Sequence, residues 1–293
     1  MPIINNYNLK QQSGILSIQS HVAYGYVGNK AAVYPLQSMG YDVWPVNTVQ
    51  FSNHTGYGQW QGEIFSREHI RNILQGIEHL GVLNQCCAIL SGYMGSADIC
   101  YEVFDIVNRL KHQNSQLLYL CDPVIGNTHC YVKPEVLNFF KTKLIADIIT
   151  PNQFEAEILS GIKITNTKNL KLTLRFFHDL GIQIVVITGV KLFDISSTDI
   201  HLVASEGKDT YIIKTKEYNF PKVISGAGDL LSAIYLGSYI ATKSIIQSLQ
   251  ISAYYMDKVM GYTLQSGAKE LQVTKISYDT VLYTNDLPRV ITI

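Results

Sequence analysis

Residues 14–48 read GILSIQSHVAYGYVGNKAAVYPLQSMGYDVWPVNT and contain the pattern that decides the fold. Residues 14–19 form a short aliphatic run typical of a buried strand, Asn29 to Met39 has the length of a helix, and residues 41–48 return to a strand pattern. A strand, a helix and a second strand in this order predict a crossover unit with two parallel strands.

The same alternation continues along the chain. Further strands are expected at residues 86–90, 117–121, 146–150 and 183–188, and further helices at residues 68–80, 97–112, 152–159 and 169–180. Two runs that flank Glu-Gly-Lys-Asp, residues 200–205 and 210–216, predict an antiparallel hairpin, followed by helices from Gly228 and over residues 245–265. The predicted fold class is α/β, a three-layer sandwich with a mostly parallel central sheet and helices on both faces, in one domain over residues 1–293.

The composition excludes several classes of protein. Apolar residues make up 47% of the 293 and charged residues 16%, so a large core is expected and disorder is not. The formal net charge of zero, without a basic stripe, argues against a nucleic-acid partner. Residues 1–10 lack an export signal, and the most apolar helical stretch, residues 230–241, is too short for a bilayer, so a cytoplasmic protein with no membrane partner is expected. Five cysteines without a Cys-x-x-Cys spacing argue against disulfides and zinc.

Residues 49–62, VQFSNHTGYGQWQG, interrupt the alternation. They are polar, aromatic and rich in glycine, and they follow neither the helical nor the strand period. We interpret this segment as a long functional loop, or flap.

Polar residues follow several of the expected strands. Ligands of open α/β sheets bind beyond the carboxyl ends of the strands, so these residues are expected to meet at one edge. They are Ser20 and His21 after the first strand, Asp122 after residues 117–121, Thr150 and Asn152 after the next strand, and Thr188 with Gly189 after residues 183–187.

The sharpest local signal is Ser225-Gly226-Ala227-Gly228-Asp229, followed by an apolar helical run. Two glycines one residue apart let the backbone approach a ligand, and the N-terminus of a helix binds anions. In phosphoryl transfer a carboxylate such as Asp229 accepts the proton of the attacking hydroxyl group. The residues alone leave open that this is an ordinary glycine loop with an acidic first turn.

Asp122 and Glu155 are the candidate carboxylates for magnesium, in part through water, because Mg²⁺ takes few carboxylates and keeps several waters. Both could instead be caps or first-turn charges of helices. The sequence contains no Gly-x4-Gly-Lys-Ser/Thr loop and no Gly-x-Gly-x-x-Gly after the first strand, so a nucleotide must be held in another way.

Taken together, these motifs resemble the pyridoxal kinases of the ribokinase-like superfamily, in particular the bacterial branch. The most specific blocks are residues 18–29, IQSHVAYGYVGN, and residues 44–55, WPVNTVQFSNHT. Further matches follow in the family's order along nearly the whole chain. They are Ser91-Gly-Tyr-Met-Gly95, Cys121-Asp-Pro-Val124, Tyr131-Val132, Thr150-Pro-Asn152 with Glu155, and Gly226-Ala-Gly-Asp229.

The resemblance implies ATP-dependent phosphorylation of the 5′-hydroxymethyl group of pyridoxal, with ATP as co-substrate, Mg²⁺, a monovalent cation as a further candidate, and a homodimer. Asp229 would be the base, in the loop with Gly226, Ala227 and Gly228. Ser20, Thr55, Gly56 and Tyr93 would line the pocket for the vitamer, and the flap over residues 49–62 would close on it. The ATP and metal side would comprise Asp122, Tyr131, Thr150, Asn152, Glu155 and Thr188.

Two positions depart from some bacterial members of this family. Gly56 stands where they carry Gln, and Thr188-Gly189 stands where they carry Lys near the ATP phosphates, which leaves the neutralising cation unassigned. The alternatives are another ribokinase-like kinase, especially one for hydroxymethylpyrimidine, and a vitamer-binding protein with little kinase activity. Tyr93 and Tyr131 could also be ordinary packed or surface aromatics, and His21 and His54 could be structural hydrogen-bonders.

Overall fold

A computed structural model describes residues 14–196, 198–280 and 287–293, so the prediction for residues 1–10 lies outside the described part. Within that part a ten-stranded sheet has the order β10-β9-β8-β7-β6-β5-β4-β1-β2-β3. The central strands from β2 to β7 are parallel, whereas β3 at one end and β8, β9 and β10 at the other are antiparallel to their neighbours. The predicted mostly parallel sheet and the hairpin over residues 200–216 are therefore confirmed.

The elements have the following bounds. The strands are β1 (Gly14–Val22), β2 (Asp42–Phe51), β3 (Gly62–Ile64), β4 (Cys86–Ser91), β5 (Leu118–Cys121), β6 (Ile148–Ile149), β7 (Ile184–Val190), β8 (Ile200–Glu206), β9 (Asp209–Thr215) and β10 (Ile291–Thr292). The helices are α1 (Asn29–Ser38), α2 (Arg67–His79), α3 (Ala97–Gln113), α4 (Pro134–Lys143), α5 (Gln153–Ser160), α6 (Thr167–Asp179), α7 (Ala227–Thr242) and α8 (Ile245–Gln265), with short 3₁₀ turns η1 (Thr55–Tyr57), η2 (Val82–Gln85) and η3 (Val273–Lys275).

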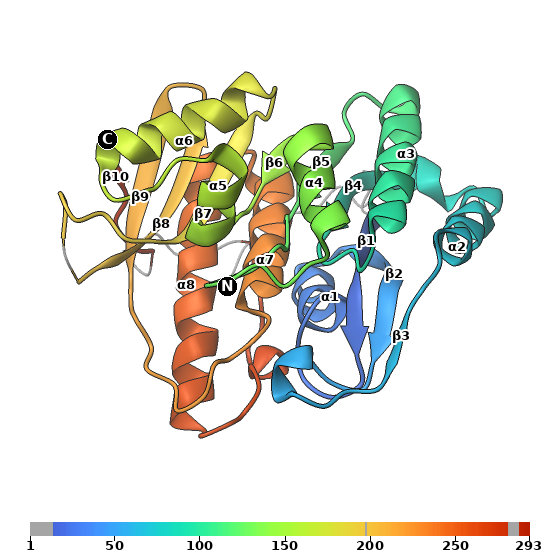
Figure 1. Cartoon of the computed structure of the whole chain (residues 1–293), viewed down its shortest axis with the longest axis horizontal. Helices are drawn as coiled ribbons and strands as arrows, with labels where there is room; N and C mark the ends of the chain where they lie inside the picture. The colour runs from blue at the N-terminus through green and yellow to red at the C-terminus, as the bar shows by residue number, and fades with distance from the viewer. Residues whose placement is uncertain (1–13, 197, 281–286) are drawn as a thin grey trace, which may run out of the picture.

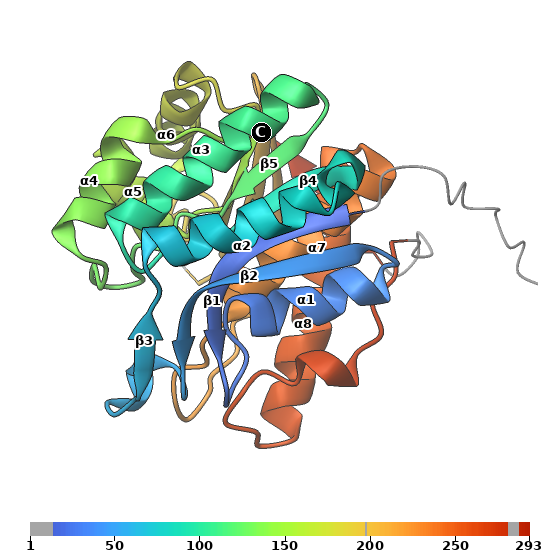
Figure 2. The same ribbon diagram turned by 90° about the vertical axis from the view of Figure 1, so that its right-hand side faces the viewer.

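Helices cover both faces of the sheet, as the two perpendicular views show (Figure 1, Figure 2). Helices α2 to α6 lie on one face, where their apolar side chains share a core with one side of the strands. Helices α1, α7 and α8 lie on the other face and pack on the opposite side of the same strands. Burial on both faces explains why the central strands read as nearly continuous aliphatic runs.

Side-chain caps set the beginnings of many helices. Ser66, Ser96, Asn152, Asn166 and Ser244 each accept a hydrogen bond from the backbone of the first turn that follows. Helix α4 begins with proline instead, at the position where the missing N–H costs nothing. No element was predicted for this segment, although α4 is as long as α1 and longer than α5.

The first two strands are longer than expected. Strand β1 runs to Val22, so Ser20 and His21 lie inside it, at a register shift against β2 between Gln19 and His21. Strand β2 continues to Phe51 because Val49 and Phe51 are buried, and it pairs with β3. The loop predicted over residues 49–62 is therefore too long, because its first residues belong to β2 and its last residue begins β3.

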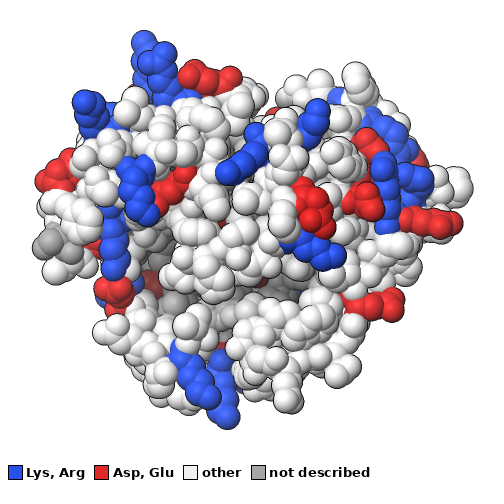
Figure 3. Space-filling model, in the orientation of Figure 1, with Lys and Arg blue, Asp and Glu red and all other residues white. Residues whose placement is uncertain are grey.

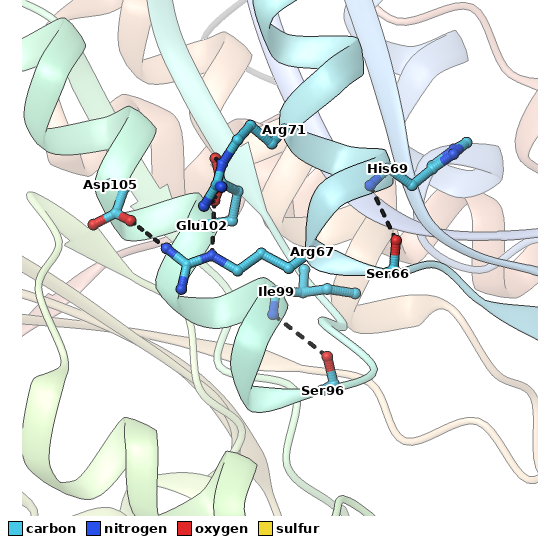
Figure 4. A network of polar contacts seen from close by, with 8 residues as sticks. All are labelled: Ser66, Arg67, His69, Arg71, Ser96, Ile99, Glu102 and Asp105. Atoms are coloured by element: carbon cyan, nitrogen blue, oxygen red, sulfur yellow. Dashed lines mark hydrogen bonds and ion pairs between the residues drawn. The ribbon is translucent and has the colours of Figure 1, made fainter.

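A polar network joins α2 to α3 on the surface of the first face (Figure 4). Arg67 and Arg71 donate to Glu102, which is only 3% exposed, and Arg67 also pairs with Asp105. The two guanidinium groups lower the pKa of Glu102, against the effect of its burial, which is the larger single influence and raises it. The network anchors the two helices to each other beside the first strands.

Charged side chains of both signs are scattered over the face shown in Figure 3, and the hollow across it is lined mostly by uncharged residues. No helix among the described residues is long and apolar enough to cross a membrane. All five cysteines are free, and three of them, Cys86, Cys100 and Cys121, are buried.

Candidate functional site

The carboxyl ends of the parallel strands bring the predicted polar residues to one edge of the sheet. Strands β1, β4, β5, β6 and β7 lie side by side in this order, so Ser20, Asp122, Thr150 and Thr188 share that edge. An isolated parallel bridge joins Asn152 to Thr188. The predicted meeting of these strand ends is confirmed, with Ser20 and Thr188 at irregular positions inside their strands rather than after them.

The glycine loop leads directly into α7, as predicted. Gly226 is the N-cap at φ +90°. No side chain accepts a hydrogen bond from the backbone N–H groups of the first turn. A Cβ at Gly226 would lie 1.8 Å from the carbonyl oxygen of Tyr26. Only glycine therefore fits between the helix start and the segment that follows β1.

Gly28 is the residue that joins the two halves of the site. Its backbone N–H lies near the carboxylate of Asp229 and acts to lower the pKa of that group. On its other side it packs against Ser20, where a Cβ would lie 2.1 Å from the carbonyl oxygen and 2.4 Å from Oγ. With φ +54° and no room for a side chain, Gly28 brings the start of α7 next to the end of β1.

Three carboxyl groups converge near this helix start. Burial raises the pKa of Asp229 to about 6, and the nearby backbone N–H of Gly28 opposes this rise. Burial raises the pKa of Glu155 to about 7, and burial together with the charges of Glu155 and Asp229 raises the pKa of Asp122 well above its ordinary value. Such a cluster of like charges favours a cation or shared protons.

Glu155 is also a structural residue. It forms a capping box with Asn152, and its two oxygens accept hydrogen bonds from the backbone N–H groups of Asn152, Ile125 and Gly126 at 2.9, 2.8 and 3.2 Å. Glu155 therefore does help to cap α5, which was one of the two roles that the sequence left open for it. Its carboxylate holds the loop after Asp122 against the start of α5, and its oxygens have little capacity left for a direct metal bond.

Asp122 is linked to the strand edge through a buried chain of hydroxyls. Ser232 of α7 donates to Asp122 Oδ2 at 3.1 Å, and its Oγ lies 2.8 Å from Thr150 Oγ1. A Cβ added to Gly228 would lie 3.6 Å from the same Asp122 oxygen. The chain fixes Asp122 beside the N-terminal turn of α7.

The residues predicted for the vitamer differ in their surroundings. Tyr93 is partly buried and packs against the apolar cluster of Val22, Val27, Val49 and Phe51. Thr55 and Gly56, in contrast, lie at the exposed tip of the flap. The first residues of the flap, Val49 and Phe51, are therefore anchored in the core while its tip reaches into solvent.

The two histidines that were left ambiguous both make hydrogen bonds. His21 Nδ1 lies 2.9 Å from Gln50 Oε1 of β2, which is a structural pairing. His54 Nδ1 accepts from the N–H of Gly56 at 3.0 Å and lies 3.2 Å from Ser225 Oγ. Burial lowers the pKa of His54, which favours the neutral ring. His54 thus connects the flap to the first residue of the glycine loop.

Tyr131 lies in the loop before α4 with 52% of its surface exposed, so it is not a core aromatic residue. Its backbone N–H bonds the carbonyl of Ile125 in the segment that Glu155 holds. Among the described residues, no group of three or more His, Cys, Asp or Glu side chains is arranged to hold a metal by itself.

Three residues of this arrangement have no local signal in the sequence: Gly28, Ser232 and Glu270, whose carboxylate accepts a hydrogen bond from Tyr57 of the flap. Gly28 lies far from Asp229 in the chain, Ser232 reads as one more small residue of an apolar helix, and Glu270 follows α8 without a motif around it. The positive φ of Gly28 is compatible with any turn, so only its contact with Ser20 reveals its role.

Comparison with known proteins finds one matching family model and relatives that are named pyridoxal kinases. The model of the family described as phosphomethylpyrimidine kinase matches residues 82–274, which include Asp229 but not Ser20 or Thr55. The pyridoxal kinase PdxY of Corynebacterium diphtheriae is 39% identical over 263 residues, 88% of this chain and 92% of the relative. That of Deinococcus radiodurans is 39% identical over 270 residues, 88% of this chain and 90% of the relative.

The fold has close counterparts among solved structures. The pyridoxal kinase of Leishmania donovani in complex with ADP and pyridoxine superposes with a TM-score of 0.86 at 26% identity, covering 97% of this chain and all of that one. Coverage of nearly the whole of both chains means that the sheet, both helical layers and the site edge are shared.

The raised pKa of Asp229 predicts a pH-dependent stability. Burial disfavours the ionised form of Asp229, so the free energy of unfolding falls as the pH rises from about 4 through 6. The rise from 3.8 to about 6 corresponds to about 3 kcal/mol. We expect Asp229→Asn to raise the Tm of the ligand-free protein by roughly 5 °C at pH 8, with the gain shrinking towards pH 4. Thermal denaturation across this range measures it; an equal gain at all pH values contradicts the assignment.

Proposed function

The chain belongs to the pyridoxal kinase family, and we propose that it transfers the γ-phosphoryl group of ATP to the 5′-hydroxyl group of pyridoxal, giving pyridoxal 5′-phosphate. The observation that carries this proposal is the junction of two glycines: Gly28 packs against Ser20, and Gly226, three residues before Asp229, packs against the carbonyl oxygen of Tyr26. Because of it, a serine able to bind the pyridine ring lies next to a carboxylate able to accept the proton of the ring's hydroxymethyl group.

In this proposal Asp229 is the general base. Its pKa of about 6 keeps it mostly ionised at neutral pH yet basic enough to take up a proton as the hydroxyl attacks. The free N–H groups of Ala227, Gly228 and Asp229 at the start of α7 would bind the transferred phosphoryl group, where the helix dipole favours negative charge. One helical turn would thus both accept the proton of the hydroxyl group and bind the negative charge of the transferred phosphoryl group.

The carboxyl cluster fits Mg²⁺. Asp122 has a buried carboxylate whose pKa is raised by the charges of Glu155 and Asp229 as well as by burial, so a divalent cation would relieve the repulsion. Asp122 would hold the ion, and Glu155 would reach it through water because its oxygens already accept three backbone N–H groups. When bound, Mg²⁺ neutralises phosphate charge and orients the phosphates.

The ATP side would be built by the ends of β6 and β7 and by the loop before α4. Asn152 and Thr188, joined by their bridge, would contact the phosphates, and Tyr131 would lie over the nucleotide from its exposed position. The hydroxyl group of Thr150 is already bonded to Ser232, so Thr150 would support Asp122 as well as border the nucleotide. Lys191, which lies just after β7 and 3.5 Å from Glu217, is a cation near this edge.

On the vitamer side, Ser20 would hydrogen-bond the pyridine ring, and Tyr93 would pack on it. Thr55 and Gly56 would contribute from the tip of the flap, whose closure would exclude water from the reacting groups. Gly56 offers no side chain to the substrate, so this contact would be made by the backbone. We further propose a homodimer and a response to monovalent cations, both on the family resemblance.

Turnover tests the role of Asp229. Purified protein with Mg²⁺, ATP and pyridoxal is expected to form the pyridoxal phosphate chromophore, and Asp229→Asn is expected to lower kcat by about 10²–10⁴-fold because general-base catalysis contributes on this scale. Asp179→Asn, at the exposed end of α6, is the matched control and should keep kcat within about 2-fold.

Near-normal turnover in Asp229→Asn would remove this residue from the role of the base. Binding of pyridoxal by the wild-type protein without any ATP-dependent product would instead support the alternative of a vitamer-binding protein.

A kinase for hydroxymethylpyrimidine is the second candidate, because the segment shared with phosphomethylpyrimidine kinases contains Asp229 but neither Ser20 nor Thr55. We expect kcat/KM for pyridoxal to exceed that for hydroxymethylpyrimidine by about 100-fold, and Ser20→Ala to narrow the ratio by about 10-fold through the lost hydrogen bond. Ser252→Ala, a buried serine of α8 whose Oγ has no partner among the described residues, is the control. A ratio that favours the pyrimidine would reverse the assignment of the substrate.

A further inference from the structure

Glu270 is a buried carboxylate outside the catalytic cluster. It lies in the turn after α8, is 8% exposed and makes contact with two segments that are distant in the sequence. The hydroxyl group of Tyr57, in the flap, donates to Glu270 Oε1. The backbone N–H of Tyr26 donates to Oε2 at 3.3 Å, and a Cβ at Gly25 would lie 2.6 Å from the same oxygen.

The Tyr57 contact is unusual because Tyr57 is otherwise a surface residue. Its side chain is 48% exposed, and its ring meets only the edge of Tyr24 at 6.2 Å among the aromatic pairs of the described residues. The hydrogen bond to Glu270 raises the pKa of Tyr57 and is the largest influence on it. A hydrogen bond from a phenol to a carboxylate is stronger than one between neutral groups, so it can hold a segment that little packing holds.

The rest of the flap is braced mainly within itself. Asn53 Nδ2 donates to the carbonyls of His54 and Gln59, and the Phe51 and Trp60 rings pack at 4.3 Å. The Asn53 contacts keep the shape of the tip, and the buried ring of Phe51 joins Trp60 to the body of the molecule at the base of the flap. The tip itself, at residues 54–57, is fixed to the body by the contacts of Tyr57 with Glu270 and of His54 with Ser225.

The second partner of Glu270 leads to the catalytic loop. The carbonyl oxygen of Tyr26 lies against Gly226, three residues before Asp229, and two residues after Tyr26 the backbone of Gly28 packs against Ser20. The carboxylate of Glu270 therefore touches both the flap and the segment over residues 25–28 that supports Asp229 and Ser20.

We propose that Glu270 is a positioning residue that latches the tip of the flap, through Tyr57, to the segment over residues 25–28. The latch holds the vitamer-binding and base-bearing parts of the site in a fixed relative position. This role rests on the proposed function for its effect on turnover, but the latch itself is a structural contact that is measurable without substrate.

The chain offers a direct reporter of the flap. Its two tryptophans are Trp44 in β2 and Trp60 in the flap, so Trp44→Phe leaves Trp60 as the sole fluorophore. In this background we expect Tyr57→Phe and Glu270→Ala to increase acrylamide quenching of Trp60. Glu270→Gln, which can still accept from Tyr57, should remain near the parent. Tyr41→Phe is the matched control, because it also loses one tyrosine hydrogen bond, to Gly237 O, at the opposite edge of the sheet.

Kinetics supply the second readout. Tyr57→Phe is expected to raise the KM for pyridoxal by about 10-fold with the KM for ATP and kcat within about 2-fold, because only the flap is released. Glu270→Ala is expected to raise the same KM and also to lower kcat, because the support of Asp229 is loosened too. Tyr57 is exposed, so its variant tests the latch even if Glu270→Ala does not fold.

Quenching in Tyr57→Phe equal to that in Tyr41→Phe would overturn the proposal, and so would a raised KM without a change in quenching. If the wild-type protein forms no pyridoxal phosphate, the proposed function fails, while the quenching series still decides whether Glu270 latches the flap.

Discussion

The junction between the segment after β1 and the start of α7 is the contact on which the rest of the site depends: Gly226 lies against the carbonyl oxygen of Tyr26, and Gly28 lies against Ser20. It can form only because Gly28 has a positive φ and no side chain, so that the end of β1 and the start of α7 approach each other across Ser20. The doubly wound sheet makes this possible by placing β1 inside the sheet, between β4 and β2. Every other element of the site is arranged around that junction.

The cost of this arrangement is electrostatic. Asp122, Glu155 and Asp229 are held near one another with raised pKa values, and the surrounding hydrogen bonds offset only part of the repulsion. Glu155 is satisfied by three backbone N–H groups, whereas Asp122 receives one hydroxyl from Ser232. Residual negative charge at the edge of the sheet, beside the positive end of α7, suits a bound cation and an anionic nucleotide. The burial of Asp229 therefore lowers the stability of the fold at neutral pH, while the same burial gives the carboxylate the basicity that the proposed reaction needs.

The parts of the fold that could be predicted are those with a strong local period or motif. The hairpin over residues 200–216, the start of α7 and the convergence of Asp122, Thr150 and Thr188 followed from strand ends and turns. Helix α4 was missed although Pro134 at its first position is a start signal and its three buried residues equal those of α5, which was predicted. The continuation of β2 to Phe51 was missed because pairing with β3, a long-range contact, overrides its polar neighbours. The contacts of Gly28, Ser232 and Glu270 join segments far apart in the chain, so no local pattern encodes them.

The central claim is that Gly28 joins the vitamer side to the base, and one substitution isolates it. Gly28→Ala would force a Cβ against Ser20, whereas Gly207→Ala, in the turn of the β8–β9 hairpin, changes a glycine of similar φ, +59°, with nothing within 4 Å. The measurement is the rate of ATP-dependent formation of pyridoxal phosphate by both variants. The structure predicts a loss of about 100-fold or more in Gly28→Ala and a change within about 3-fold in Gly207→Ala. Near-wild-type turnover in a folded Gly28→Ala protein would contradict the account.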